Sequence, residues 1–514
     1  MPDSPLPLLG QRHRLAAWVV IAIGAALRFG AIGAGAPYRV ANDEPFVVGM
    51  ALQIMKSGDF NPHFFDYGGL SIYLHTVVGV FSFLLGAMAG QWSRVDAVWI
   101  GDLLPAARFV TAAMGTLTVF LVYRIGLRLG PRVALMAGFV MAVLPQHVRE
   151  SHFALTDTPL TLLITAALLM SLRAVEQRRV AAVFAAACMV GLAASVKYNG
   201  GVALIMPLTA ALVLPAGLRL RGLGLALLGA GGAFLLTSPY AVLDLPAFLN
   251  GFGKLSQSYN QGRHPVEAAW IYLKYMRNWF SWADVAPTNV GYVAILLGVV
   301  GVALVALRRG MSLTRTGAAI VLVFPCLWFF MLAEQGGLQY GRYLLPMMPM
   351  FCLCLGTTLV ALWNGSRRFG APGIWALRVA VIALLVLPAG SAVGWVRDHA
   401  HPRTEELAAA WIVREVPPGQ LVFVEAAAVA LPPTIKAYFV HRLVDRPLET
   451  YKEQGGMYLV TTAAETDPYF TGPFADPAKA AAYRDLVART EPAATFHADA
   501  NTLGPHISIM RIRP

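Results

Sequence analysis

The chain has little charge for its size. Only 13% of its 514 residues are Asp, Glu, Lys or Arg, whereas 57% are hydrophobic and the mean hydropathy is +0.59. A water-soluble core cannot bury that much apolar surface, but a helix bundle in a bilayer can expose it to lipid. The composition therefore excludes an ordinary soluble domain and indicates an integral membrane protein.

Cysteine is also scarce. The four cysteines, Cys188, Cys326, Cys352 and Cys354, all fall in apolar stretches that are expected to span the membrane. Neither a disulfide framework nor a zinc site is indicated by this placement. The N-terminal stretch has no evident cleavage pattern, so the first span is expected to remain as a signal anchor.

Acidic side chains are nearly missing from one set of loops. Six clusters between apolar runs contain sixteen arginines, whereas the same loops hold just Asp3 and Glu176 as acids. By the positive-inside rule, these loops face the cytoplasm. The net charge of +12 therefore orients the protein and does not indicate nucleic-acid binding. The clusters are Arg12 and Arg14; Arg124, Arg128 and Arg132; Arg173, Arg178 and Arg179; Arg219 and Arg221; Arg308, Arg309 and Arg315; and Arg367, Arg368 and Arg378.

Eleven apolar runs are long enough to be read as membrane spans. They are residues 15–33, 104–123, 133–147, 158–172, 180–196, 202–218, 222–236, 290–307, 317–332, 343–363 and 375–396. A further run, 70–90, would reverse the side of every later arginine cluster if it crossed. We expect it to lie in the outer interface of the membrane. The alternative is that this run is a twelfth span, in a topology that violates the positive-inside rule.

The chain changes character after residue 396, where charged residues, prolines and histidines return. Residues 404–416 and 478–490 have helical spacing, and 421–425, 457–461 and 507–512 have the pattern of strands. We expect an α-helical polytopic membrane domain at 1–396 and a small α/β domain at 397–514, outside the membrane on the side of Asp43. The second domain either covers a site, binds an acceptor or is a stabilising appendage.

Several carboxylates fall on the outward side by the same loop count. Asp43 and Glu44 follow the first span, Asp66 precedes the interfacial run, and Asp157 stands two residues before Pro159. Taken alone, Asp157 is typical of an ordinary helix cap. Four acids on one membrane face instead favour a shared polar pocket. We therefore take Asp43, Glu44 and Asp157 as candidate catalytic residues, and Asp66 as a candidate for substrate contact.

Isolated cations stand on the same side. Lys197 ends a span, Arg342 begins one, and Arg28 lies near the outer end of the first helix. Cations at helix ends often extend to lipid head groups, which is the simpler interpretation. Arginine can also bind phosphate through two hydrogen bonds, and lysine as a point charge. We expect Lys197, Arg342 and Arg28 to bind a lipid phosphate.

Acids and cations on one membrane face fit the transfer of a sugar from a lipid phosphate. A carboxylate would accept the proton of the attacking hydroxyl or amine, and the cations would stabilise the departing phosphate. Interfacial helices and the second domain would exclude water. The residues therefore favour a membrane transferase.

Five sequence features together resemble the GT-C glycosyltransferases. They are the early acidic pair, the acid before the interfacial run, Ala-Leu-x-Asp-x-Pro-Leu, Lys-Tyr-Asn-Gly and Arg-Tyr-Leu-Leu-Pro-x-x-Pro. The branch that they resemble contains protein O-mannosyltransferases and the aminoarabinose transferase of lipid A, and the resemblance covers roughly residues 15–365. It implies a GT-C fold, a polyprenyl-phosphate sugar donor and inversion at the anomeric carbon. Together with the sidedness of the charges, we expect a bacterial inner-membrane enzyme with a periplasmic active site.

The resemblance also implies roles for individual residues. Asp43 matches the acid assigned as base, with Glu44 beside it, and Asp157 matches the second outward acid. Lys197 matches the cation that binds lipid phosphate, and Arg342 matches a late arginine near the donor phosphate. These roles agree with those inferred from charge and sidedness.

The sequence departs from the branch in two places. Asp66 and Tyr67 stand where the lipid A enzymes have a Glu-Lys pair, so aminoarabinose transfer is not expected. The loop insertion of eukaryotic protein mannosyltransferases is not recognisable either. The acceptor, whether lipid, glycan or protein, stays open.

Other outward residues could contact substrate or a metal. The candidates for substrate contact are Tyr67, Tyr198, Asn199, Asp244, Tyr259 and His264, although aromatic residues at this depth are also typical of membrane belts. Asp43, Asp66, His63 and His152 could bind a divalent cation through oxygen and nitrogen. Interfacial histidines bonded to loops are the alternative, and the resemblance does not require a metal.

A polytopic transporter or flippase for a lipid-linked or anionic substrate is the rival function. It too could line an outward cavity with charges, and the 48 glycines would permit broken helices. The acids lie at one surface rather than at mid-membrane, and no inverted repeat is visible. A ligase for finished polysaccharide would favour arginine-rich outer loops, which the sequence lacks. These features favour the transferase.

Overall fold

The computed structural model describes residues 10–41, 43–260, 262–281, 289–307, 311–425, 428–471 and 475–513. By their contacts, these residues form two compact units. The first comprises Met1–Ile32, Phe46–Leu85 and Ala106–Val396, and the second comprises Gly33–Pro45, Gly86–Pro105 and Arg397–Pro514. Two pieces of the first long loop thus belong to the same unit as the C-terminal tail.

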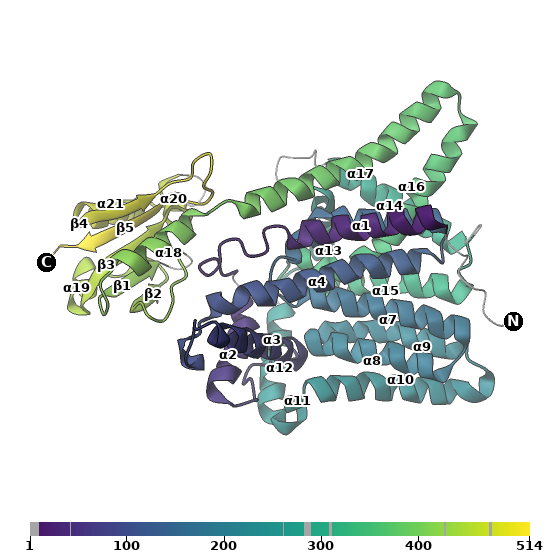
Figure 1. Cartoon of the computed structure of the whole chain (residues 1–514), viewed down its shortest axis with the longest axis horizontal. Coiled ribbons are helices and arrows are strands. Elements are labelled where there is room, and N and C mark those ends of the chain that lie inside the picture. The colour runs from purple at the N-terminus through teal and green to yellow at the C-terminus, as the bar shows by residue number, and fades with distance from the viewer. Residues whose placement is uncertain are drawn as a thin grey trace. The chain divides into compact units, whose positions relative to one another are not determined.

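The first unit is a bundle of apolar helices (Figure 1). Each of the predicted spans overlaps a helix of this bundle. The helices are α1 (Gln11–Phe29), α4 (Ile100–Gly126), α5 (Pro131–Val143), α7 (Asp157–Gln177), α8 (Val180–Val196), α9 (Ile205–Leu212), α10 (Ala216–Thr237), α14 (Asn289–Leu307), α15 (Arg315–Glu334), α16 (Met348–Gly365) and α17 (Ala371–Ala400). Leu, Val, Ala and Met side chains from most of these helices form one continuous core.

Eight helices of the described residues are long and apolar enough to cross a membrane, judged by length and composition. They are Gly69–Met88, α4, α7, α10, α14, α15, the segment Gly341–Arg368 that contains α16, and α17. The predicted spans at α5, α8 and α9 are shorter, and α1, with its three arginines, is not among the eight. The structure is that of a multi-pass membrane protein.

Two of the eight are the most buried. The apolar windows of α7 and of Gly341–Arg368 are 78% and 83% buried, against 17% for α10 and 28% for α14. These two segments are therefore central, and α10 and α14 have mostly lipid-facing surface. Asp157 is the first residue of α7 and Arg342 stands at the start of the other segment, so both lie at ends of central helices.

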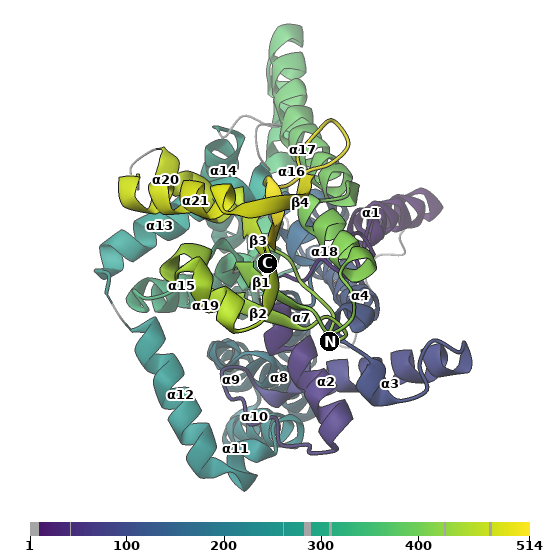
Figure 2. The ribbon, with the colours of Figure 1, turned by 90° about the vertical axis from the view of Figure 1, so that its left-hand side faces the viewer.

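The interfacial run forms α3 (Gly69–Met88), which lies across the ends of the bundle helices and not along them (Figures 1 and 2). Its first turn is attached to the bundle, because Gly69 N donates to Ser238 Oγ at 2.8 Å. Farther along, Phe81 and Leu85 are exposed. Although its composition would allow a span, this crosswise position favours the predicted interfacial helix.

Within the described residues, the second unit is built on a five-stranded sheet of order β2-β1-β3-β5-β4. β1 pairs in parallel with β2 and β3, whereas β5 pairs antiparallel with β3 and β4. The strands are β1 (Leu421–Glu425), β2 (Ala437–Val440), β3 (Gly456–Thr462), β4 (Thr490–Phe496) and β5 (Ile507–Ile512), and the main helices are α18 (Thr404–Glu415), α19 (Leu448–Glu453), α20 (Ala463–Phe470) and α21 (Pro477–Ala488).

The predicted small α/β fold of the tail is confirmed, with strands at β1, β3 and β5 and helices at α18 and α21. The edge strands β2 and β4 escaped prediction. β2 exposes Tyr438 and Phe439 in succession and so lacks alternation, and β4 contains Pro492, which weakens a strand pattern.

Candidate functional site

Three charged side chains from three segments meet at one end of the bundle. Lys197 directly follows α8, and Arg342 lies in the 3-10 helix Gly341–Met347. Lys197 Nζ donates to Asp157 Oδ1 at 3.0 Å, and Arg342 Nε lies 3.5 Å from Asp157 Oδ2. The side chains of Asp157 and Lys197 are 4% and 9% exposed, whereas that of Arg342 is 21% exposed. The pair of Asp157 and Lys197 is thus shielded from solvent, whereas part of the Arg342 side chain is accessible.

Asp157 does not act as a side-chain cap of α7. The cap position is Thr156, and no side chain there accepts a hydrogen bond from the first turn. The carboxylate of Asp157 instead uses both oxygens on cations, while the positive end of the α7 dipole also favours its charge. The structure therefore contradicts the alternative of a plain cap and places Asp157 with two cations. The pocket shared by all four acids stays a prediction.

Aromatic rings pack against both cations. Lys197 Nζ lies 4.1 Å from the centre of the Tyr343 ring, and Arg342 Cζ lies 4.5 Å from that of Tyr340. The carbonyl of Tyr343 accepts a hydrogen bond from Trp328 Nε1 at 2.9 Å. These contacts position the cations independently of Asp157. Sequence reasoning missed these three aromatic residues. For Tyr340 and Tyr343, their closeness to Arg342 in Tyr-Gly-Arg-Tyr could have indicated the contact; Trp328 had no such signal.

Tyr259 reaches the same cluster from the last turn of α12 (Leu245–Tyr259), since its hydroxyl lies 3.2 Å from that of Tyr343. The loop before Arg342 fits closely under this turn, where Gly337 N donates to Tyr259 O at 2.8 Å. A Cβ atom at Gly337 would lie only 2.3 Å from Ser258 O, so glycine is required. Of the candidates for substrate contact, Tyr259 therefore joins the charged cluster.

A second buried carboxylate in the bundle, Glu150, escaped sequence reasoning. It ends α6 (Pro145–Glu150) and is 4% exposed. Gln146 Nε2 donates to Glu150 Oε1 at 2.8 Å, Arg149 Nη1 lies 3.4 Å from the same oxygen, and Thr158 Oγ1 donates to Glu150 O at 3.0 Å. Gln146 and Glu150 are four residues apart, a spacing at which side chains on a helix can hydrogen-bond, and this could have indicated the pair.

Other candidates gather around the loop before α3. The hydroxyl of Tyr198 donates to the carbonyls of Phe65 and Tyr67, each at 3.0 Å. Asn61 Nδ2 donates to Asp244 Oδ2 at 2.8 Å. These polar groups serve to hold the loop against the bundle, so Tyr198 and Asp244 have structural partners where sugar contacts were expected.

Three further candidates have different surroundings. Asp66 lies in the same loop, where the surrounding protein partly removes its carboxyl from water and so raises its pKa, while nearby Lys254 opposes that rise. His264 accepts a hydrogen bond from Val266 N at the start of α13 (Pro265–Arg277). Asn199 is half-buried beside Lys197, and its Oδ1 has no hydrogen-bond partner among the residues the structure describes.

The histidines proposed as metal ligands are used within the protein. His63 Nε2 lies 2.9 Å from Asp59 Oδ2, and this contact lowers the pKa of Asp59. Both ring nitrogens of His152 lie 2.8 Å from backbone carbonyl oxygens. Across the described ranges, no three His, Cys, Asp or Glu side chains are placed to hold a metal ion together. His63 is thus bonded within its loop, whereas His152 is buried between the ends of two helices. Metal binding stays a prediction.

Arg28 does not fit the predicted role in lipid-phosphate binding. It is fully buried, and its guanidinium donates to the carbonyls of Gly24, Met141 and Ala142, each at 2.9 Å. Its Nη2 also lies 2.9 Å from His147 Nδ1. The side chain turns inward because these acceptors surround it, a feature that the position of Arg28 near a helix end does not reveal.

Asp43 and Glu44 belong to the second unit, four and five residues after Arg39. Arg39 forms an ion pair with Glu406 in α18 and donates to the carbonyls of His399 at 2.7 Å and His401 at 2.9 Å. The start of the tail therefore holds the segment that leads to the acidic pair.

The two acids differ in their environment. Glu44 is fully buried, and its Oε2 accepts a hydrogen bond from Ala41 N at 2.8 Å. Asp43 is half-buried. Asp43 is thus the more accessible carboxylate, and Glu44 stabilises the turn.

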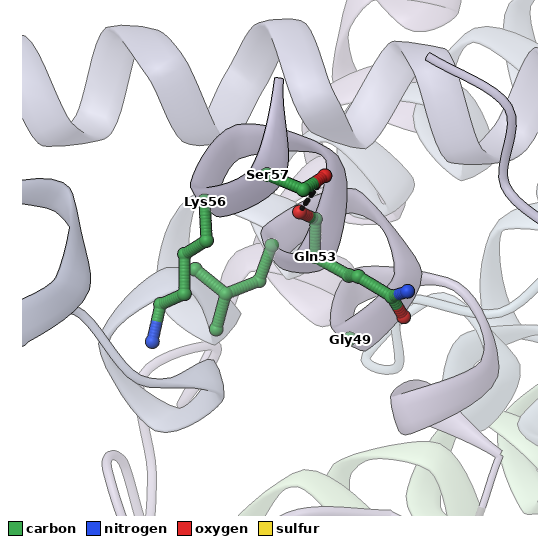
Figure 3. Close-up of a pocket in the computed structure, with 5 residues that line it drawn as sticks. Gly49, Gln53, Lys56 and Ser57 are labelled. Atoms are coloured by element: carbon green, nitrogen blue, oxygen red, sulfur yellow. Dashed lines mark hydrogen bonds between the residues drawn. The ribbon is translucent and has the colours of Figure 1, made fainter. Parts of the chain in front are cut away.

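A hollow of about 420 Å³ on α2 (Val48–Ser57) is a weaker candidate (Figure 3). It is lined by Gly49, Leu52, Gln53, Lys56 and Ser57, and the hydroxyl of Ser57 donates to the carbonyl of Gln53 at 2.9 Å. With one cation and no acid in its lining, it offers less chemistry than the cluster at Asp157.

Comparisons with known proteins agree with this description. Residues 97–243, which include Asp157 and Lys197, match the family described as dolichyl-phosphate-mannose-protein mannosyltransferase. No curated protein sequence matches the chain significantly.

Solved structures match nearly the whole chain. ArnT from Cupriavidus metallidurans, bound to undecaprenyl phosphate, matches with a TM-score of 0.55 at 15% identity, covering 97% of each chain. AglB from Archaeoglobus fulgidus, in complex with an inhibitory peptide and a dolichol-phosphate, matches with a TM-score of 0.54 at 12% identity, covering 96% of this chain and 74% of that chain. The chain therefore has the GT-C glycosyltransferase fold, as its motifs predicted.

Proposed function

We propose that this chain transfers a sugar, a hexose or pentose, from a polyprenyl-phosphate donor to an acceptor on the periplasmic face of a bacterial inner membrane. The observation that carries the proposal is the pair of cations, Lys197 and Arg342, held around one buried carboxylate at helix ends. Removing charges from water costs free energy, so buried charges in a membrane protein usually have a function. A lipid phosphate beside the partly exposed Arg342 would be bound by this charge.

The similar proteins support a lipid-phosphate substrate. The matching family is named for dolichyl-phosphate-mannose, and the two solved structures contain undecaprenyl phosphate and dolichol-phosphate. A membrane-embedded carrier of this kind would keep its tail in the bilayer and bring its phosphate to the helix ends.

The proposed reaction breaks one bond and forms one. The acceptor hydroxyl or amine attacks the anomeric carbon while the bond from that carbon to the phosphate oxygen breaks, and its electron pair stays on the phosphate. Asp43 accepts the acceptor's proton. Lys197 and Arg342 stabilise the charge that develops on the leaving phosphate. Attack opposite the leaving group inverts the anomeric centre.

The test is incubation of the purified full chain with a panel of polyprenyl-phosphate sugars, with and without a chelator. We expect release or transfer of sugar by the wild type, and a loss of about 100-fold or more with Asp43→Asn, the range for removing a general base. Asp96→Asn, an exposed acid of the same unit paired with Arg94, is the matched control. Equal rates for wild type and Asp43→Asn would refute Asp43 as the base. Inactivity of the wild type with every donor, combined with donor movement across vesicles, would favour a flippase.

A further inference from the structure

We propose that the charge of Asp157 controls how tightly the site holds the spent carrier relative to the donor. This inference rests on the proposed function, because it assumes that Lys197 and Arg342 bind the carrier's phosphate. It gives Asp157 a role in product release, whereas the sequence predicted only that Asp157 is catalytic.

Both oxygens of Asp157 are bound to cations, Oδ1 to Lys197 and Oδ2 to Arg342, at 3.0 and 3.5 Å. Both carboxylate oxygens are therefore already engaged by side chains of the protein. What Asp157 does supply is one negative charge that opposes two positive ones. Removing it adds one unit of positive charge to the site, whatever else surrounds it.

The two forms of the carrier differ in charge. The donor is a phosphodiester with one negative charge. After the sugar leaves, the phosphate is a monoester, which carries between one and two negative charges at neutral pH because its second pKa is about 6. A more positive site would therefore favour the spent carrier over the donor. By opposing the cations, Asp157 reduces that preference and so helps the product to leave.

The aromatic contacts argue for this electrostatic role over a purely positional one. Tyr343 and Tyr340 lie against Lys197 and Arg342, at 4.1 and 4.5 Å from their cationic groups. These rings do not depend on Asp157, so the cations should stay in place when its charge is removed. The substitution Asp157→Asn would then change the charge of the site more than its shape.

The experiment compares two probes that need no sugar: undecaprenyl phosphate and its methyl ester. Competitive binding to the full-length protein in detergent at pH 8 gives the ratio of their affinities. We expect Asp157→Asn to shift this ratio toward undecaprenyl phosphate by about tenfold, as one extra charge at close range requires. Asp157→Glu, which keeps the charge, should stay near the wild-type ratio.

Glu176→Gln is the matched control, because it removes a charge from the same helix. Glu176 pairs with Arg128 and lies about 28 Å from Asp157 along α7, by the rise of an α-helix. Its ratio should equal that of the wild type. Circular dichroism and gel filtration establish whether each variant folds. If Asp157→Asn does not fold, Lys197→Gln decides, since losing a positive charge should shift the ratio toward the methyl ester.

The outcomes separate the two proposals. If the wild type binds neither probe, the proposed function fails and this inference fails with it. If the wild type binds both and the folded Asp157→Asn has an unchanged ratio, or one shifted toward the methyl ester, only the inference is overturned. An unchanged ratio in Lys197→Gln, where that variant decides, also overturns it.

Discussion

The ammonium group of Lys197 lies 4.1 Å from the centre of the Tyr343 ring. This contact joins the end of α8 to the segment before α16, two parts of the chain far apart in sequence. A cation over an aromatic face is stabilised by the ring's electron density, and more strongly where water is excluded. The tyrosine ring thus acts as a support for the cation that we assign to the lipid phosphate.

Two substitutions of Tyr343 should distinguish the contribution of its ring from that of its hydroxyl. Tyr343→Phe keeps the aromatic face and loses only the contact with Tyr259, so we expect polyprenyl-phosphate affinity close to wild type. Tyr343→Leu removes the face, and a loss of about 0.5–2 kcal/mol in binding free energy follows from the usual size of this interaction. Titration with undecaprenyl phosphate measures both. Equal affinity of the Leu and Phe variants would show that the ring does not support Lys197.

Arg28 should matter for stability and not for donor binding. Its guanidinium is fully buried and donates to three carbonyls, so Arg28→Gln removes these charge-assisted hydrogen bonds. We expect a stability loss of about 2–4 kcal/mol, as for other broken buried charge networks. Thermal unfolding in detergent measures it. A variant of wild-type stability with a raised donor KM would instead restore the original prediction of phosphate binding.

The hydroxyl of Tyr198 should hold the loop before α3. Tyr198→Phe keeps the ring, which packs near Phe234, Phe248 and Phe252, and removes the two hydrogen bonds to carbonyls of the loop. We expect faster hydrogen exchange at residues 65–70 and little change in the bundle. Asn61→Ala, which frees Asp244, should have a similar local effect. Unchanged exchange in Tyr198→Phe would leave the hydroxyl available for substrate.

Glu425 at the end of β1 should make the second unit sensitive to pH. It is fully buried, which raises its pKa, although hydrogen bonds from Tyr483 Oη and Leu443 N oppose the rise. A carboxyl with a raised pKa binds its proton more tightly in the folded state than in the unfolded state. The free energy of unfolding should therefore fall as the pH rises from the ordinary carboxylate range through the raised pKa.

Glu425→Gln removes this titration, so the variant should gain stability relative to wild type as the pH rises. Thermal unfolding of the full chain between about pH 4.5 and 8 checks the difference. Glu449→Gln is the control, because Glu449 is exposed and a hydrogen bond from its own backbone N–H, together with Arg489, lowers its pKa, which gives the opposite sign. If the unfolding temperatures of wild type and Glu425→Gln change in parallel with pH, the prediction is wrong.

Local patterns in the sequence were enough to determine much of this protein. Hydropathy places the helices of the bundle, because a lipid-facing helix needs a long apolar run wherever it packs. Strands β1, β3 and β5 are readable because they are short apolar or alternating runs between turns. The positions of Asp157, Lys197 and Arg342 at helix ends follow from the same local reading, as does the GT-C resemblance.

Only the tertiary structure decided which of these charges meet. The side chains of Asp157, Lys197 and Arg342 come together through the packing of three segments, while Arg28, which has equal standing in the sequence, turns inward to backbone carbonyls. Tyr343 and Tyr259 become partners because a glycine loop lets α12 approach. Hydropathy and spacing describe one helix at a time, whereas the pairing of ionic groups depends on how helices pack against one another.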